Sequence, residues 1–311
     1  MASEAAIRSF GPPSGFDLKA YLAAHSRRIN DALAEILVLE YAGSRLAAAM
    51  RYSLNAGGKR IRPILCLAAA EAVGGTAESV MPAACAIEMI HTYSLIHDDL
   101  PAMDDDRLRR GKPTCHIAFD EATAILAGDG LLTMAFQVLS RPEHLIKTVD
   151  NRTKLQVIHL LSSAAGPDGM IEGQMRDLEA EGVRIGLEDL QNLHELKTGA
   201  LIRASVVCGA LLSSASEMET ERLETYARNI GLAFQVTDDI LNVEGDPDQM
   251  GKARGSDELR GKSTYPGLLG LEASRQFARD LITNSLKAID VFDNRSDPLR
   301  AIAQYILERR R

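Results

Sequence analysis

Apolar residues recur at helical spacing along almost the whole chain, and this periodicity constrains the fold more than any other feature. Between residues 16 and 39, Leu18, Leu22 and Ile29 fall roughly on one face of a helix. Alternation with a period of two, which predicts strands, is nearly absent. The pattern predicts helices over residues 16–39, 43–55, 63–73, 77–99, 116–140, 142–165, 168–181, 187–214, 218–244, 265–291 and 298–309. We therefore expect an all-α fold of ten or more helices in one domain, residues 1–311.

The helix predicted over 77–99 is apolar or small on nearly every face. A helix of this kind belongs in the centre of a large protein. Hydrophobic residues make up 46% of the 311 residues, which is enough for a sizeable core. The longest predicted loops are 100–114 and 245–264, and each closely follows an Asp-Asp pair.

Charge and cysteine usage exclude several classes of protein. The net charge is −8, from 35 basic and 43 acidic side chains, and no basic patch carries interleaved aromatics. We therefore expect no nucleic-acid partner. The cysteines are widely spaced, without a Cys-x-x-Cys pair, so we expect buried reduced thiols. They are Cys66, Cys85, Cys115 and Cys208.

No segment has the pattern of a targeting or membrane-spanning sequence. Residues 1–16 lack a basic start followed by an apolar stretch, and no window approaches 18 uninterrupted apolar residues. We expect a soluble cytoplasmic protein with no membrane span.

An acidic cluster follows directly on the apolar helix, within residues 95–113. Asp98 and Asp104 are six positions apart, about 120° out of phase on a straight helix. Pro101 lacks a backbone donor and disfavours helix in the residue before it, so the helix should break there. Such a break would let both carboxylates face one cation.

A second Asp-Asp pair, Asp238-Asp239, ends another apolar run far downstream. Asn242 lies one helical turn beyond Asp238 and shares its face. Carboxylate and amide oxygens suit Mg²⁺, which keeps several waters and bridges to substrate phosphate. His97 is the only histidine beside either cluster. A ligand set of many oxygens and one imidazole argues against zinc.

Short basic runs beside glycine supply candidate contacts for phosphate, because glycine allows close backbone approach to an anion. These runs are Gly57-Gly58-Lys59-Arg60-Ile61-Arg62-Pro63, Arg109-Arg110, Lys197-Thr198-Gly199, Gly251-Lys252 and Gly261-Lys262-Ser263. Each alone is weak, since most lysines and arginines are solvated surface charges. The first run is no Walker loop, because its spacing and a preceding strand are missing.

The combination of these motifs resembles the short-chain trans-prenyl diphosphate synthases, most of all the bacterial farnesyl diphosphate synthases. The resemblance covers roughly residues 40–270. Its segments are Gly-Gly-Lys-Arg-Ile-Arg-Pro at 57–63, Asp-Asp-x-x-x-x-Asp at 98–104 with Arg109 to Thr114, Lys197-Thr198-Gly199, Phe234-Gln235-x-x-Asp238-Asp239, and Lys262 to Pro266.

This resemblance implies a helical bundle around a central cavity, of the isoprenoid synthase type, and a homodimer. It implies head-to-tail condensation of isopentenyl diphosphate with an allylic diphosphate. It also implies Mg²⁺, three ions with diphosphate bound, for which Mn²⁺ can substitute. The cations neutralise the charge that grows on the departing diphosphate.

The resemblance assigns roles by position. Asp98, Asp104 and Asp238 become metal ligands, with Asp99 and Asp239 as direct or water-mediated support. The allylic diphosphate is contacted by Arg109, Lys197 and Lys252, and more loosely by Lys262. Isopentenyl diphosphate is contacted by Lys59, Arg62, His91 and Arg110. The oxygens of Thr198 and Gln235 face the allylic cation. Residue reasoning alone favours a core histidine at His91; the resemblance favours a ligand.

Two positions bear on product length and metal binding. Tyr93 precedes Asp98 by about one and a half helical turns, so its ring can form the floor of the pocket for the growing chain. Asn242 stands where the family usually has a third Asp, which predicts weaker metal affinity without loss of activity.

Four alternatives remain open at this point. The same chemistry can end at C10 or C20. A terpene cyclase shares an Asp-rich helix, but residues 238–250 do not fit its Asn/Asp-Ser/Thr-Glu triad. A non-catalytic regulatory subunit would usually have lost its Asp motifs, and a bare metal-binding module leaves the separated cations unexplained.

Overall fold

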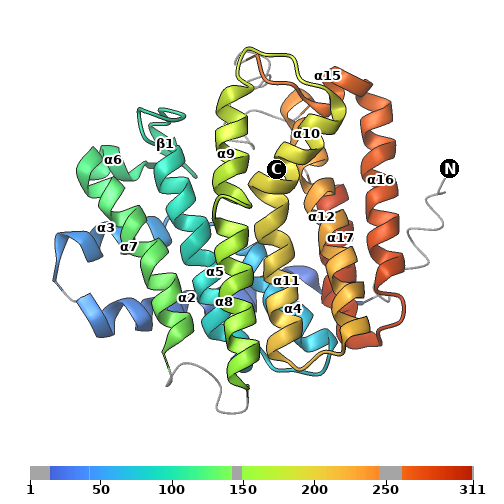
Figure 1. Ribbon diagram of the computed structural model, residues 1–311, viewed down its shortest axis with the longest axis horizontal. Helices are drawn as coiled ribbons and strands as arrows, with labels where there is room; N and C mark the ends of the chain where they lie inside the picture. The colour runs from blue at the N-terminus through green and yellow to red at the C-terminus, as the bar shows by residue number, and fades with distance from the viewer. Residues whose placement is uncertain (1–14, 42, 142–148, 245–260, 310–311) are drawn as a thin grey trace.

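The computed structural model describes residues 15–41, 43–141, 149–244 and 261–309 (Figure 1). Helices dominate these ranges, and the strands within them are two residues each, β1 (Leu108–Arg109) and β2 (Lys112–Pro113). The predicted all-α bundle of ten or more helices is confirmed. The helices are α2 (Leu18–Tyr41), α3 (Arg45–Leu54), α4 (Ile61–Ala72), α5 (Ala77–Asp98), α6 (Cys115–Ala118), α7 (Glu121–Ser140), α8 (Asn151–Ala165), α9 (Met170–Glu179), α10 (Leu187–His194), the π-helix η1 (Glu195–Gly199), α11 (Ala200–Leu212), α12 (Glu217–Glu244), α15 (Tyr265–Leu269), α16 (Leu271–Ala288), the 3-10 helix η2 (Asn294–Ser296) and α17 (Asp297–Glu308).

Two segments that were each predicted as a single helix form two consecutive helices instead. The helix expected over 116–140 is split into α6 and α7, because Asp120 caps a new helix by accepting from the backbone N–H of Thr123 at 2.7 Å. The helix expected over 265–291 is split into α15 and α16 at Gly270, whose φ of 82° suits glycine. Periodicity continues across both breaks, so it did not reveal them.

Two further predictions differ at their boundaries. The helix expected over 142–165 begins at Asn151, capped by Asp150, and residues 142–148 lie outside the described ranges. The segment expected as a loop over 100–114 contains the β1–β2 hairpin, in which Leu108 pairs with Pro113 and Arg109 with Lys112. Two-residue strands are too short to show a period-two pattern.

Helix α5 lies in the middle of the bundle, packed against α4, α7 and α11. Small side chains such as Ala83, Ala84 and Ala86 are at most 1% exposed and let neighbouring helices approach closely. The predicted central position of this helix is confirmed. All four cysteines are buried and free, as expected.

One helix in the described ranges, α7, is long and apolar enough to cross a membrane by length and composition alone. That test is also passed by core helices of globular proteins. In α7, 44% of the most apolar window is buried, and the helix packs against α5 and α3.

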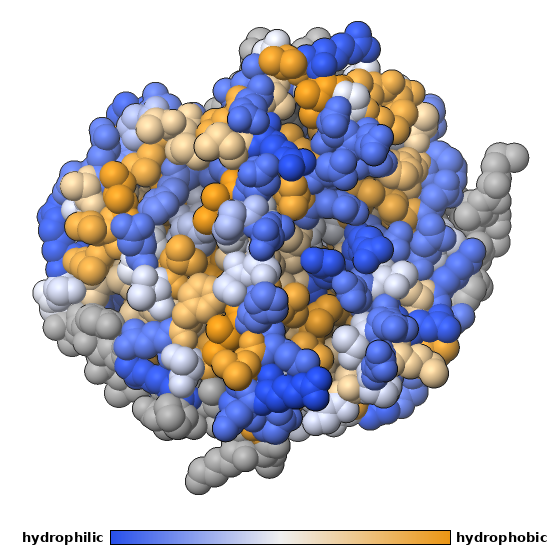
Figure 2. All heavy atoms as spheres, in the orientation of Figure 1, coloured by the Kyte–Doolittle hydropathy of each residue, from blue (hydrophilic) through white to orange (hydrophobic). Residues whose placement is uncertain are grey.

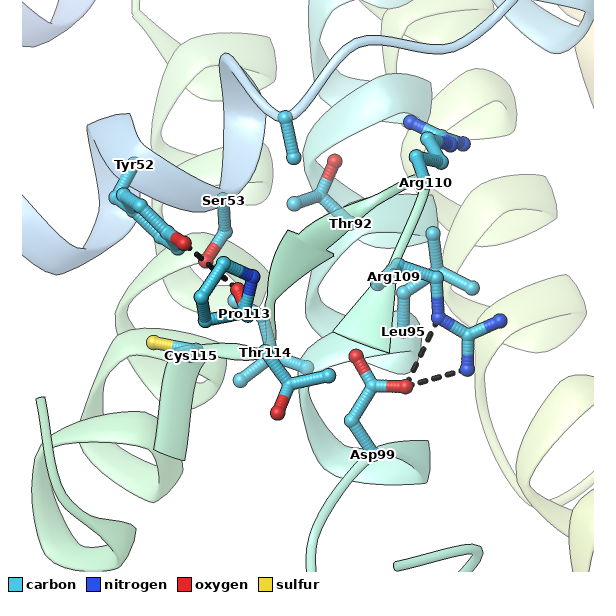
Figure 3. A pocket seen from close by; sticks show the side chains of 12 residues that line it. Tyr52, Ser53, Thr92, Leu95, Asp99, Arg109, Arg110, Pro113, Thr114 and Cys115 are labelled. Atoms are coloured by element: carbon cyan, nitrogen blue, oxygen red, sulfur yellow. Dashed lines mark hydrogen bonds and ion pairs between the residues drawn. The ribbon is translucent and has the colours of Figure 1, made fainter. Parts of the chain in front are cut away.

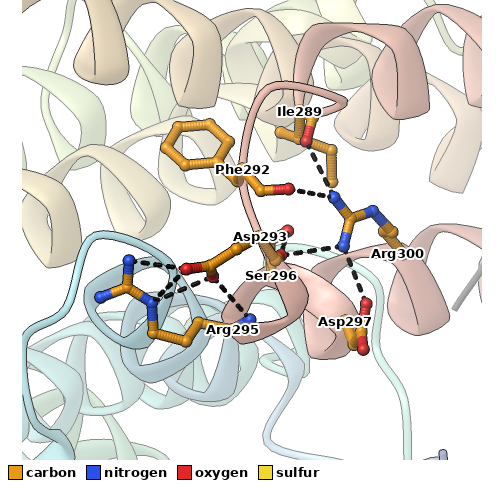
Figure 4. Close-up of polar contacts among 7 residues, drawn as sticks. All are labelled: Ile289, Phe292, Asp293, Arg295, Ser296, Asp297 and Arg300. Carbon is orange, nitrogen blue, oxygen red and sulfur yellow. Dashed lines mark hydrogen bonds and ion pairs between the residues drawn. The ribbon is translucent and has the colours of Figure 1, made fainter. Parts of the chain in front are cut away.

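The C-terminal helix α17 is anchored by the side chain of Arg300 (Figure 4). Its guanidinium donates to the carbonyl of Phe292 at 2.6 Å and to Asp297 at 2.8 Å, and it also reaches the carbonyls of Ile289 and Asp293. These hydrogen bonds give partners to backbone carbonyls of the turn that joins α16 to α17. They anchor α17 at its start.

Candidate active site

The first acidic cluster forms where α5 ends. The backbone N–H of Asp104 donates to the carbonyl of Asp98 at 2.9 Å, so the chain folds back on the helix end. The break predicted at Pro101 is therefore present. Burial raises the pKa of Asp98 to about 6, and the charges of Asp104 and Asp99 add to this, against the opposing effect of Lys197. Crowded carboxylates of this kind favour a bound cation.

Asp99 differs from its neighbour. It is only 3% exposed and accepts from Arg109 Nε at 2.9 Å and from Nη2 of the same side chain (Figure 3). Burial raises the pKa of Asp99, and Arg109 acts against that rise. In this structure the Asp99 carboxylate holds the guanidinium of Arg109.

The β1–β2 hairpin is also tied to the end of α3 and the turn after it. The hydroxyl of Tyr52 donates to the carbonyl of Pro113 at 2.7 Å, and Arg110 donates to the carbonyl of Gly57. Gly58 has a φ of 117° and lies so close to the Arg110 guanidinium that a Cβ would collide with it. Between the hairpin, α3 and α5 lies a small pocket of about 30 Å³, with Thr92 and Cys115 in its lining (Figure 3).

The second acidic cluster lies on α12. Asp238 accepts from Arg309 Nη2 at 2.5 Å, and Arg309 also stacks 3.9 Å above the ring of Phe234. Asp239 is 7% exposed and accepts from the backbone N–H of Tyr265 at 2.9 Å. Desolvation raises the pKa of Asp238, while Arg309 is the charge that most opposes this rise.

Sequence reasoning missed Arg309. The available signal was the arginine run that ends the chain, residues 309–311. Such a run usually indicates solvated surface charge. It is α17, anchored at its start, that carries this arginine back to Asp238.

Lys197 and Thr198 lie on the π-helix η1, inside the helix predicted over 187–214. π-helices are rare and frequent at functional sites. Gly173 of α9 packs so tightly against the backbone of Lys197 that a Cβ would collide with it. The irregular turn and its lysine are thus fixed by a close helix contact.

Asp177 joins two of the predicted lysines. Lys197 Nζ and Lys262 Nζ each donate to its Oδ2 at 2.7 Å. Burial raises the pKa of Asp177, but the two lysines outweigh burial and the net shift is downward. Sequence reasoning missed this residue, because the two lysines that bind it lie 20 and 85 positions away. Lys252 lies outside the described residues.

The four side chains predicted to contact isopentenyl diphosphate come from three segments. Lys59 Nζ lies 5.4 Å from the ring centre of Tyr305, and Arg62 is in the first turn of α4. Burial lowers the pKa of Arg62, and it lowers that of His91 well below the usual value, with further lowering from Arg62 and Arg110. His91 is therefore a neutral imidazole near pH 7.

Tyr93 is 6% exposed, and its buried hydroxyl has no hydrogen-bond partner. Its ring meets that of His97 edge-on at 5.8 Å. Burial, with the added effect of Asp98, raises the pKa of Tyr93 to about 12.

The two residues predicted to face the allylic cation lie on different helices. Thr198 on η1 is 8% exposed, and Gln235 lies partly buried on α12, one turn before Asp238.

Within the described ranges, no three His, Cys, Asp or Glu side chains form a preassembled metal cage. The acids are instead divided between the ends of α5 and α12. This donor set fits Mg²⁺, which takes one or two carboxylates and completes its shell with water and substrate phosphate.

Comparison with known proteins adds the family. Residues 44–297 match the polyprenyl synthetase family. The chain belongs to this family. The resemblance stated from its motifs is thereby confirmed, and the chain is a prenyltransferase rather than a bare metal-binding module.

Relatives within the polyprenyl synthetase family differ in the product that their names give. The chain is 48% identical to a farnesyl diphosphate synthase of Micrococcus luteus over 268 residues, 86% of this chain and 90% of that protein. It is 45% identical to a chloroplastic geranylgeranyl pyrophosphate synthase of Catharanthus roseus over 302 residues, 96% of this chain and 84% of that protein. Family membership is shown, and product length is not fixed by similarity.

The fold agrees with that of solved family members. An FPP/GFPP synthase from Zymomonas mobilis superposes with a TM-score of 0.82 at 40% identity, covering 93% of this chain and 98% of that one. These likenesses support prenyl transfer over the terpene-cyclase alternative.

Proposed function

We propose that this chain is a Mg²⁺-dependent farnesyl diphosphate synthase that joins isopentenyl diphosphate to dimethylallyl and then geranyl diphosphate. The observation that carries the proposal is the division of charged groups into two Asp clusters and two separate sets of cations. Lys197 and Lys262 of the first set both bind Asp177, and Arg62 and Arg110 of the second set lie close enough to His91 to lower its pKa. Two diphosphates need two cationic sites, whereas hydrolysis or cyclisation of one diphosphate needs only one.

In this proposal Asp98, Asp104 and Asp238 hold the metal, supported by Asp99 and Asp239. Bound Mg²⁺ would supply the charge that lets diphosphate depart. The residues that bind the allylic diphosphate are Arg109, Lys197, Lys252 and Lys262. Those that bind isopentenyl diphosphate are Lys59, Arg62, His91 and Arg110.

The reaction needs no strong side-chain base. The C–O bond of the allylic diphosphate breaks, and the double bond of isopentenyl diphosphate supplies the electrons for the new C–C bond. The proton then lost from C2 of that unit goes to the departed diphosphate. Thr198 and Gln235 face the cation with their oxygens, and the apolar surface of α5 excludes water that would otherwise trap it.

Product length follows from Tyr93 in this proposal. Its buried ring lies one and a half turns below Asp98, and we assign it as the floor that stops growth at C15. A product of C10 or C20 is the alternative outcome of the same chemistry.

We further propose that residues 1–311 form one domain, located in the cytoplasm, and that a second copy of the chain covers the face formed by α7 and α8. Ile125 and Leu126 of α7 are 44% and 58% exposed, and Leu155 of α8 is 66% exposed. Figure 2 shows apolar side chains gathered among polar ones over this part of the molecule. Light scattering during size-exclusion chromatography tests the homodimer.

One incubation tests the main proposal. The protein is given labelled isopentenyl diphosphate with dimethylallyl or geranyl diphosphate, in Mg²⁺ or in EDTA, and the dephosphorylated alcohols are separated by chromatography. We expect farnesol as the main alcohol with Mg²⁺ and no elongation in EDTA. Absence of elongated alcohols in Mg²⁺ would contradict the proposal.

A further inference from the structure

A buried ion pair lies beneath the proposed isopentenyl-diphosphate site. Arg60 Nη1 donates to Glu88 Oε1 at 2.6 Å, and the two side chains are 3% and 2% exposed. Arg60 also donates to Asn30 Oδ1 at 2.9 Å and to the carbonyl of Leu54. Removing two charges from water costs free energy, and the hydrogen bonds to these partners offset that cost.

Arg60 occupies a backbone position that its side-chain contacts can stabilise. Arg60 has a φ of 52°, in the left-handed region, and stands between Lys59 and Arg62 at the start of α4. A left-handed non-glycine residue costs free energy and persists when its surroundings hold it in place. The guanidinium of Arg60, bound to Asn30, Glu88 and the carbonyl of Leu54, supplies that hold. It thereby fixes the backbone from which Lys59 and Arg62 project.

Glu88 connects this turn to the other half of the same site. It lies on α5, one helical turn before His91, so both are on one face of that helix. Burial lowers the pKa of Arg62 and Arg110, and the Glu88 carboxylate is the charge that most offsets this in both. Glu88 is thus the common counter-charge of a crowded group of cations.

We propose that Arg60 and Glu88 are positioning residues for the isopentenyl-diphosphate site: they touch no substrate, but they lock the turn carrying Lys59 and Arg62 onto the helix carrying His91. This inference rests on the assignment of those side chains to isopentenyl diphosphate. The pair makes the site preorganised, so the substrate does not have to gather mutually repelling cations.

A single substitution separates positioning from simple electrostatics. Glu88→Gln keeps the volume and an oxygen acceptor but removes a negative charge. If Glu88 acted only through its charge, the variant would bind diphosphate more tightly. If it positions the cations, the variant binds more weakly. The two effects have opposite signs.

The matched control is Glu71→Gln, at the other end of α4, where the carboxylate accepts from Tyr21 at 2.7 Å. For Glu88→Gln we expect the KM for isopentenyl diphosphate to rise about tenfold, while the KM for geranyl diphosphate stays within about twofold. Calorimetric titration with isopentenyl diphosphate in EDTA should show the same weakening without turnover. Glu71→Gln should change neither KM.

A second variant keeps the test decisive if Glu88→Gln folds poorly. Arg60→Lys retains the charge but loses the fork that reaches Asn30 and Leu54, and we expect it also to raise only the KM for isopentenyl diphosphate. An unchanged or lowered KM, or equal rises for both substrates, would overturn the positioning role. Arg110→Gln checks the assignment of this site to isopentenyl diphosphate. If Arg110→Gln leaves the KM for isopentenyl diphosphate unchanged, that assignment fails. If Arg110→Gln raises this KM but the Glu88 and Arg60 variants do not, only the positioning role of Arg60 and Glu88 is refuted.

Discussion

Asp104 donates its backbone N–H to the carbonyl oxygen of Asp98 at 2.9 Å, and the charge of its carboxylate contributes to the raised pKa of Asp98. The two aspartates are thus neighbours across a chain reversal although a straight helix would point them apart. Lys197 opposes the rise in the pKa of Asp98, and a bound cation would relieve the repulsion between the two carboxylates further. This relationship explains why a proline follows the first Asp pair.

Removal of either carboxylate should disable the enzyme. We expect Asp98→Asn and Asp104→Asn to lower kcat by about 10²- to 10³-fold, because in the proposed site each carboxylate contributes charge that holds the metal at the departing diphosphate. Steady-state rates over a Mg²⁺ titration measure the effect. Asp105→Asn is the control, since Asp105 lies in the same loop, is exposed and has a φ of 51° that asparagine adopts readily. Wild-type Mg²⁺ dependence in Asp104→Asn would remove it from the ligand set.

The lysine pair on Asp177 gives a second prediction. Asp177→Asn removes the charge that holds Lys197 and Lys262 side by side, so we expect the KM for geranyl diphosphate to rise about tenfold. The KM for isopentenyl diphosphate should stay within about twofold. Glu181→Gln is the control, because Glu181 is more exposed and lies 3.7 Å from Lys262. Equal changes in both KM values would show that Asp177 serves general stability only.

Tyr93 tests the length of the product. If Tyr93 is the floor proposed above, Tyr93→Ala should shift the main product from C15 toward C20, and Tyr93→Phe should keep C15 because the ring remains. The Tyr93 hydroxyl has no partner, so its loss in the Phe variant breaks no hydrogen bond. Chromatography of the dephosphorylated alcohols gives the distribution. C15 output from both variants would refute the assignment.

His194 predicts a pH dependence of stability. Burial lowers its pKa to about 4, with Lys197 and Lys262 adding to the shift and Asp177 opposing it. In the unfolded chain the histidine takes up a proton near pH 6.5, so the unfolded state binds more protons between pH 6.5 and 4. The folded protein should therefore lose stability across that window as pH falls, by roughly 3 kcal/mol at most.

Denaturant unfolding of wild type and His194→Gln at pH 7, 5.5 and 4 measures this effect. The glutamine cannot take up a proton, so the variant should lose less stability than wild type over the same window. Parallel pH profiles of the two proteins would contradict the prediction. A second substitution, His159→Gln on the exposed face of α8, should leave the wild-type profile in place.

Local patterns were enough to predict the helical fold and the two acidic clusters. Helical period, the proline after Asp99 and the glycine beside each basic run are all readable within a few positions. The roles that depend on distant contacts were not readable. Asp177 meets Lys262 across 85 positions, and Arg309 reaches Asp238 across 71. The breaks at Asp120 and Gly270 were missed because capping and a positive φ override an apolar pattern that continues across them.

Asn242 tests how the second acidic cluster tolerates a missing charge. It is 8% exposed on α12, one turn beyond Asp238, at the position where the resemblance to the family led us to expect an acid. Asn242→Asp adds a carboxylate to the cluster, so we expect the Mg²⁺ concentration for half-maximal rate to fall severalfold while kcat changes little, because charge count tunes affinity for a hard cation. Asn229→Asp, earlier on the same helix, is the control and should leave that concentration unchanged. If Asn242→Asp also leaves it unchanged, the asparagine has no part in metal affinity and the substitution in this chain is neutral.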